Sequence, residues 1–118
     1  MLVLKRTPCA SAMLAYFGVK GVTWNTRTRK NVWEGTLRRN GYTVRSRMSK
    51  IKKGSSVGSI RKTLEKVAAN EPDILAFVVR IKSHVLVVDR TGKTIVDTDK
   101  RKRDKRKVLG LIAVMRKD

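Results

Sequence analysis

Apolar positions recur at helical spacing in three stretches of the N-terminal part of the chain. The clearest lies at 57–69, where apolar residues follow one another every three or four positions and either Ser55 or Ser56 can cap the start. A second stretch, at 28–40, has a thinner apolar pattern and ends before Gly41. Both stretches predict helices.

Residues 8–17 form the third predicted helix. Thr7 can act as its N-cap, Pro8 suits the first helical position, and Gly18 provides the stop. The residues that we expect on its apolar face are Met13, Tyr16 and Phe17. Cys9 then lies in the first helical turn.

After Pro72 the pattern changes to short segments rich in β-branched residues and separated by turn or charge signals. The predicted strands lie in DILAFVVRI, HVLVVD, TIVDTD and VLGLIAVM. An alternating segment at 42–48 predicts an earlier strand. Because consecutive strands with short connections pair antiparallel, we expect the N-terminal helices to pack on a mainly antiparallel sheet built by the C-terminal half. The sequence predicts an α+β fold in a single domain, 1–118.

Basic residues dominate the charge. Lys and Arg number 29 and Asp and Glu 9, which gives a formal net charge of +20. Such a chain is drawn to polyanions, and each cation that neutralises a phosphate releases a counterion. The densest run, KRKRDKRK, is predicted to bind DNA or RNA phosphates without sequence specificity; the alternative is a solvated loop. Its candidate residues are Lys100, Arg101, Lys102, Arg103, Lys105, Arg106 and Lys107.

Aromatic residues are few, at 5% of the chain. Trp24, Trp33 and Tyr42 can stack on bases, but we expect both tryptophans to lie in the core.

Several classes of site are disfavoured. A single cysteine excludes an intrachain disulfide and a zinc finger, and neither a phosphate-cradling glycine loop nor a dinucleotide fingerprint occurs. The acids at 97–99 can in principle bind a metal, but flanking Lys and Arg make a cation unfavourable there, so we expect no metal. No apolar run approaches the roughly 18 residues that span a bilayer, and the start of the chain is too short an apolar stretch for a secretion signal.

Cys9, His84 and a following acid form an arrangement that suits covalent catalysis. A thiolate is the strong nucleophile, and a helix N-terminus stabilises its charge. An imidazole such as that of His84 can take the thiol proton and later protonate the leaving amine, while a carboxylate on its other nitrogen fixes the tautomer. Asp97 and Asp99 are the candidates for that third role. The structural alternative is a buried cysteine on a helix and a histidine that caps a strand edge.

The hairpin that follows His84 allows two registers. In one, Asp89 opposes Thr94 and His84 faces Asp99 directly. In the other, DRTGK forms a type I turn with a glycine bulge and Asp89 opposes Lys93. A one-step slip exchanges the faces of a strand, so the second register puts neither acid on the face of His84 without a further irregularity.

The order of these elements resembles the papain-like cysteine peptidases, in particular the small peptidase domain with which bacteriocin exporters trim double-glycine leader peptides. TPCASAMLAYFG is similar in spacing to that family's DCGxAxLxMxxxYYG-like segment, in which the cysteine begins the first helix. Pro72, DILAFVVRI, HVLVV and VDTDK are similar to the family's proline, hydrophobic strand, HFVVL and DP features. The resemblance covers most of the chain.

The resemblance implies a papain-like fold and cleavage of a peptide or amide bond, without a cofactor. Cys9 would be the nucleophile, His84 the general base and acid, and Asp99 the residue that orients it, with Lys100 in place of the family's proline. The family also carries a Gln about five residues before the cysteine that helps to bind the oxyanion. Leu4 stands there, and the chain contains no Gln. Loss of one such donor typically lowers the rate by about 10²- to 10³-fold.

Two hypotheses therefore remain. The protein is a small cysteine peptidase that acts on a peptide or another protein, or it is an inactive, basic binding protein associated with nucleic acid or with a virion. Compact basic proteins of this kind resemble products of tailed phages, so the expected location is the host cytoplasm or the inside of a phage particle.

Overall fold

The computed structural model describes residues 13–19, 30–82, 84–97 and 105–116. A helical turn at 13–16 comes first. The elements that follow in chain order are α2 (Lys30–Arg39), β1 (Tyr42–Ser46), the short 3-10 helix η2 (Met48–Lys50), α3 (Val57–Asn70), β2 (Ile74–Ile81), β3 (His84–Val88), β4 (Thr94–Asp97) and β5 (Gly110–Arg116).

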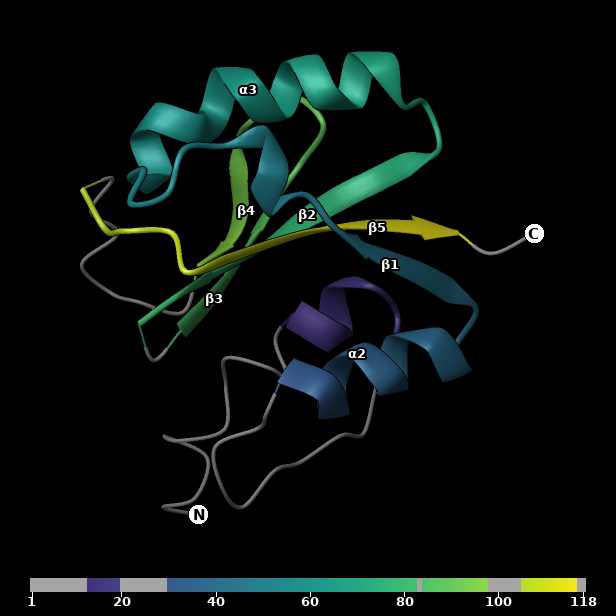
Figure 1. Ribbon diagram of the computed structural model, residues 1–118. Coiled ribbons are helices and arrows are strands. Elements are labelled where there is room, and N and C mark those ends of the chain that lie inside the picture. Colours follow the sequence, from purple (N-terminus) through teal and green to yellow (C-terminus); the bar gives the residue numbers. More distant parts are fainter. Residues whose placement is uncertain (1–12, 20–29, 83, 98–104, 117–118) are drawn as a thin grey trace.

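The described strands form one antiparallel sheet of five, in the spatial order β1-β5-β2-β3-β4 (Figure 1). The strand predicted at 42–48 is present, ends at Ser46, and pairs with the last strand. The four strands predicted after Pro72 are also present. The predicted α+β class and antiparallel pairing are therefore confirmed.

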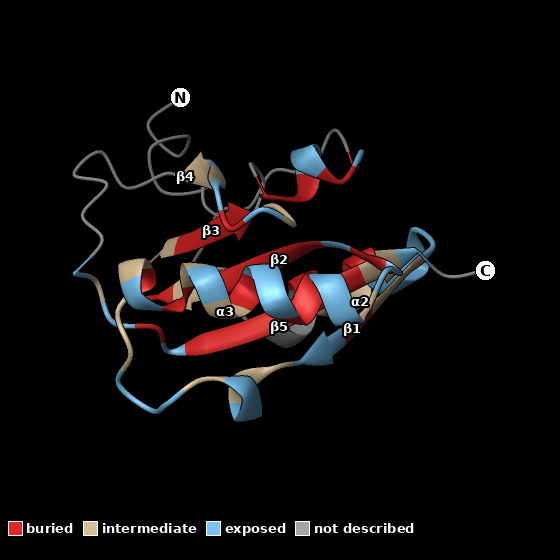
Figure 2. Ribbon diagram, turned by 90° about the horizontal axis from the view of Figure 1, so that it is seen from above, coloured by how far each residue is buried: buried red, intermediate tan, exposed pale blue. Residues whose placement is uncertain are grey.

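Helices cover both faces of the sheet: α3 lies over one face, and α2 with the helical turn at 13–16 lies over the other (Figure 1). Val78 belongs to the cluster on the α2 side, whereas its neighbours Phe77 and Val79 belong to the cluster under α3. Figure 2 shows β2 and β5 as mostly buried beneath α3. The continuous apolar runs of these strands follow from this arrangement, because both of their faces are covered.

The first predicted helix ends as its sequence indicates. Gly18 has a φ of +86°, its N–H donates to Ala15 O at 3.0 Å, and the N–H of Val19 donates to Leu14 O at 2.9 Å. These two bonds form a Schellman motif, which uses a glycine because the left-handed conformation strains other residues.

The predicted apolar face of this helix was wrong at one position. Met13 and Phe17 are buried as expected, but Tyr16 is 42% exposed and Leu14 is fully buried. Both sets of residues satisfy three- and four-residue spacing, and only the packing against the sheet distinguishes them.

Trp33 and Tyr42 help to bind α2 and β1 to the same side of the core. Trp33 is 3% exposed, which confirms its predicted place in the core, while Trp24 lies outside the described residues. Tyr42 packs on the cluster and its hydroxyl donates to Phe17 O at 2.6 Å. Trp33 is therefore not available for stacking on bases, and Tyr42 is tied to the core through its hydroxyl.

The clearest predicted helix, α3, extends over Val57–Asn70. Of the two serines expected to cap it, Ser56 is the cap, since its side chain accepts from the N–H of Ser59 at 3.3 Å. The residues that its apolar spacing singled out are all buried.

Candidate functional site

The sequence-predicted site residues fall into two groups. Cys9, Asp99 and the basic residues 100–103 lie outside the described residues. The described members are His84, Asp97, Lys105, Arg106 and Lys107.

His84 is the first residue of β3 and is partly exposed. It pairs across the β2–β3 hairpin with Ile81, which belongs to the cluster under α3. The described end of the cysteine-bearing segment, residues 13–17, packs on the opposite face of the sheet. The structure therefore gives the place of His84 in the sheet. Its distance from Cys9 is not defined, because Cys9 lies outside the described residues.

The turn between β3 and β4 has the hydrogen bonds of the predicted glycine bulge. The N–H of Asp89 donates to Lys93 O at 2.9 Å, the N–H of Gly92 donates to Asp89 O at 3.1 Å, and Gly92 has a φ of +86°. One oxygen of the Asp89 carboxylate accepts from the N–H and the hydroxyl of Thr91 and from the N–H of Lys93. Burial alone would raise the pKa of Asp89, but these hydrogen bonds outweigh it and lower the pKa.

Beyond the turn the register shifts once more. Val88 pairs with Thr94, but Val87 pairs with Val96, so Ile95 is an additional residue on the β4 side. Leu86 then pairs with Asp97. The extra residue Ile95 is the further irregularity without which the glycine-bulge register puts neither Asp97 nor Asp99 on the face of His84.

The shift returns β4 to the other of the two predicted registers. Val87 with Val96 and Leu86 with Asp97 are pairs of the register in which Asp89 would oppose Thr94, and position 99 itself lies outside the described residues. The observed hairpin thus combines the two alternatives: one register at the turn and the other where the strands approach His84.

Asp97 is engaged by a different partner. Arg106 donates from Nη1 to Oδ1 at 3.1 Å and from Nη2 to Oδ2 at 2.9 Å, and the side chains of Asp97 and Arg106 are 7% and 14% exposed. A bidentate pair of this kind fixes both planar groups. Of the two acids considered for orienting His84, Asp97 is therefore the one that forms an ion pair with an arginine.

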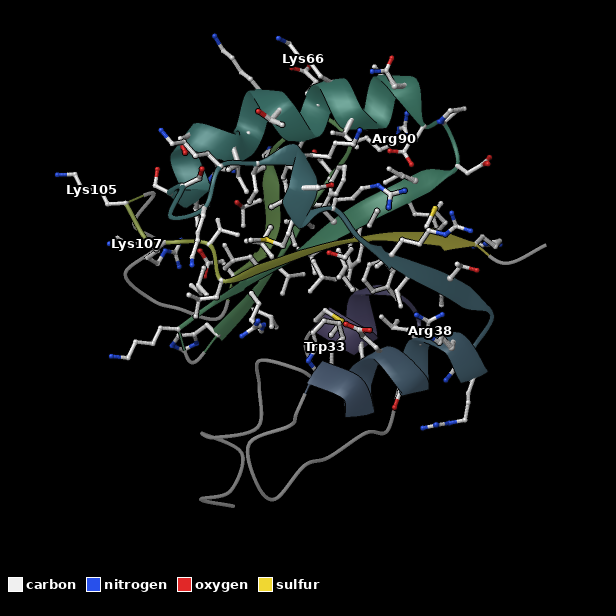
Figure 3. The ribbon with its side chains drawn as sticks, in the orientation of Figure 1. Trp33, Arg38, Lys66, Arg90, Lys105 and Lys107 are labelled. Carbon is white, nitrogen blue, oxygen red and sulfur yellow. The ribbon has the colours of Figure 1, made fainter. Side chains whose placement is uncertain are left out.

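Backbone bonds attach the end of the basic run to the start of α3. Val57 N–H donates to Arg106 O at 2.8 Å, and Val108 N–H donates to Ser55 O at 2.8 Å. Arg106 turns inward to Asp97, whereas Lys105 and Lys107 are exposed and project from the molecule (Figure 3). Backbone hydrogen bonds therefore hold this segment in the fold. Arg106 points into the protein, and Lys105 and Lys107 point into the solvent.

Sequence reasoning missed Lys62 and Lys66, which lie four residues apart on the outer face of α3 and are both exposed. The signal that could have found them lies in the polar positions of the helix rather than in its apolar spacing.

In the part of the chain that the structure describes, no three His, Cys, Asp or Glu side chains gather in a way that could hold a metal ion. The described helices also include none with the length and apolar character needed to cross a membrane. Comparison of the chain with protein-family models, with curated proteins and with solved structures finds no match.

Proposed function

We propose that the protein is a small papain-like cysteine peptidase that cleaves a peptide or amide bond with Cys9, His84 and Asp99. The observation that carries this proposal is the register shift between β3 and β4, after which the described pairs, Val87 with Val96 and Leu86 with Asp97, follow the register in which the sequence predicts that His84 faces Asp99. Residues directly opposite one another on antiparallel strands have side chains on the same face and within contact range. The engagement of Asp97 by Arg106 further favours Asp99 as the orienting acid.

In this mechanism His84 takes the proton of the Cys9 thiol, and the thiolate attacks the substrate carbonyl carbon. The tetrahedral intermediate collapses when His84 gives that proton to the leaving amine, which leaves a thioester on Cys9. Water, deprotonated by His84, then hydrolyses the thioester and restores the thiol. Asp99 keeps the imidazole in the required tautomer throughout.

The oxyanion must be bound without the glutamine side chain of the family, since Leu4 stands at that position. In the proposed mechanism the remaining stabilisation would come from backbone N–H groups at the start of the helix that the sequence predicts at 8–17. The proposed enzyme is accordingly a slow one, about 10²- to 10³-fold below a peptidase with the full set of donors.

Alkylation of Cys9 by iodoacetamide, measured against pH, tests this proposal. We expect the rate to inflect well below the reference thiol value of about 8.5, and His84→Ala to return the inflection to that value. Asp99→Asn should shift it part of the way. A thiol whose profile is ordinary and unchanged by His84→Ala would contradict the proposal.

A second candidate function, binding of a polyanion by a catalytically inactive protein, is favoured by a different observation. Lys105 and Lys107 are exposed and are held at the end of α3 by the bonds of the intervening backbone. Binding of this kind should weaken steeply as salt is raised. An affinity for nucleic acid that does not change with salt concentration would contradict this second function.

A further inference from the structure

Exposed lysines lie on the outer face of α3 and in the two segments that meet at its N-terminal end. They come from the connection that precedes the helix, from its outer face, and from the segment before β5. We call the set the lysine surface; its members are Lys50, Lys52, Lys53, Lys62, Lys66, Lys105 and Lys107.

Backbone hydrogen bonds join the connection before α3 to the segment before β5 at the start of the helix. Ser55 N–H donates to Lys52 O at 3.1 Å, and Ser55 O in turn accepts from Val108 N–H at 2.8 Å. Lys107 forms a β-bridge with Ser56, the cap of α3. Figure 3 shows Lys66 on the outer side of α3 and Lys105 and Lys107 beyond its N-terminal end.

Few acids oppose this charge. Among the acids that the structure describes, Glu65 is the exposed one on the outer face of α3, and the exposed Asp73 follows the other end of the helix. Asp97 and Glu71 are paired with arginines. Among the described residues, the seven lysines of this surface therefore face one exposed carboxylate on the outer face of α3, that of Glu65, so the surface keeps a positive potential.

We propose that the lysine surface binds the phosphate backbone of duplex nucleic acid without reading its sequence. The proposal rests on the second candidate function and names its partner. Lysine ammonium groups contact phosphates as point charges, without the planar fork through which arginine reads guanine. Affinity then comes from counterion release along the duplex.

The side chains around these lysines favour a duplex over a single strand or a membrane. Single-strand binding relies on exposed aromatic rings, and the described part of the lysine surface has none. An amphipathic helix that enters a lipid surface must expose its apolar side, but that side of α3 is buried on the sheet.

A pair of charge-matched variants of the full chain tests the surface. Lys105→Gln/Lys107→Gln removes two cations from it, whereas Arg39→Gln/Arg116→Gln removes two exposed cations from α2 and from the end of β5. Both variants have the same net charge. Circular dichroism melting of each verifies that the fold is retained.

The probe is a fluorescent DNA duplex of about 20 base pairs, titrated by anisotropy over a series of salt concentrations. The slope of log K against log salt should become shallower by about 2 in Lys105→Gln/Lys107→Gln, at roughly 0.9 for each phosphate that is no longer neutralised. The charge-matched control should keep the slope of the wild type. Lys62→Gln/Lys66→Gln should act like the first variant.

Each other outcome has a defined meaning. An equal loss in both charge-matched variants would show that net charge acts without a defined surface, and would overturn the proposal while keeping polyanion binding. Tighter binding of a single strand, or of vesicles of anionic lipid, would also overturn it. Absence of salt-dependent binding in the wild type would remove the second candidate function itself.

Discussion

Arg106 and Asp97 form a bidentate ion pair that joins the segment before β5 to the end of β4. Both side chains are largely buried, at 14% and 7% exposed. A buried pair is costly to break, because removal of one partner leaves the charge of the other without compensation.

Asp97→Asn should therefore destabilise the protein by about 3 kcal/mol, measured as the change in the free energy of urea unfolding. The double variant Asp97→Asn/Arg106→Gln should cost less than the two single changes added together, since it leaves no buried charge unpaired. Additive effects in this cycle would show that the two side chains do not depend on each other.

The β3–β4 turn approaches α3 so closely that a side chain at Gly92 cannot fit. A Cβ built there would lie 2.7 Å from the carbonyl oxygen of Arg61, and Gly92 has a φ of +86°. Arg61 also donates from Nη1 to Gly92 O and to Thr94 Oγ1, both at 2.9 Å. The glycine thus serves both the turn and the packing of the turn against the helix.

Gly92→Ala should lower the free energy of unfolding by more than about 2 kcal/mol, because backbone strain and a clash with backbone atoms add together. Gly54→Ala is the matched control: Gly54 has a φ of +84°, and its added Cβ would meet nothing within 4 Å. That variant should show the strain alone, about 1 kcal/mol. Equal losses in the two variants would argue against the close approach to Arg61.

Glu71, the C-cap of α3, gives the stability a pH dependence. The hydrogen bond from Arg47 lowers the pKa of the Glu71 carboxyl below its ordinary 4.5, against the opposing effect of burial. A carboxyl whose pKa is lower in the folded state contributes stability above its unfolded value and loses it as the pH falls through the folded value. The contribution is therefore present at neutral pH and disappears in acid.

Glu71→Gln should accordingly be less stable than the wild type at pH 7, and the difference should close as the pH falls below about 4. Urea midpoints of both proteins at a series of pH values measure this. A difference that stays constant over the series would assign the effect of Glu71 to something other than its charge.

The hairpin shows how far local sequence determines this structure. DRTGK carries its own turn signal, because Asp89 can bond the following N–H groups and Gly92 accepts a positive φ. The extra residue Ile95 has no such signal. It lies on the edge strand β4, and only the pairing of β4 with β3 determines which residue of β4 has no paired residue on β3.

The basic run illustrates the same limit for the candidate site. Its composition indicates an affinity for phosphate, but nothing local distinguishes Arg106 from the cations beside it. Arg106 turns inward because the fold brings Asp97 to that point, and Lys105 and Lys107 point outward as a result. Tertiary contacts therefore determine which cation of a uniformly basic run is paired inside the fold, and the sequence pattern does not show it.

Arg90 closes the opposite end of α3. Its Nη2 donates to Ala68 O at 2.6 Å, and its Nη1 donates to Ile74 O at 2.5 Å and lies 3.3 Å from the carbonyl oxygens of Glu71 and Pro72. These bonds reach carbonyls at the helix end and in the connection to β2, of which those of Ala68 and Glu71 also accept from the N–H groups of Glu71 and Ile74.

Arg90→Gln should therefore cost about 2 kcal/mol in the free energy of unfolding, because several carbonyls lose a charged donor together. Arg90→Lys should recover only part of the loss, since a single ammonium group cannot reproduce the fork that reaches Ala68 and Ile74 at once. Hydrogen exchange should localise the effect to the last turn of α3, where the amide protons of wild type exchange more slowly than those of the variant. Full recovery by lysine would show that charge at the helix end, rather than the shape of the guanidinium group, is what Arg90 contributes.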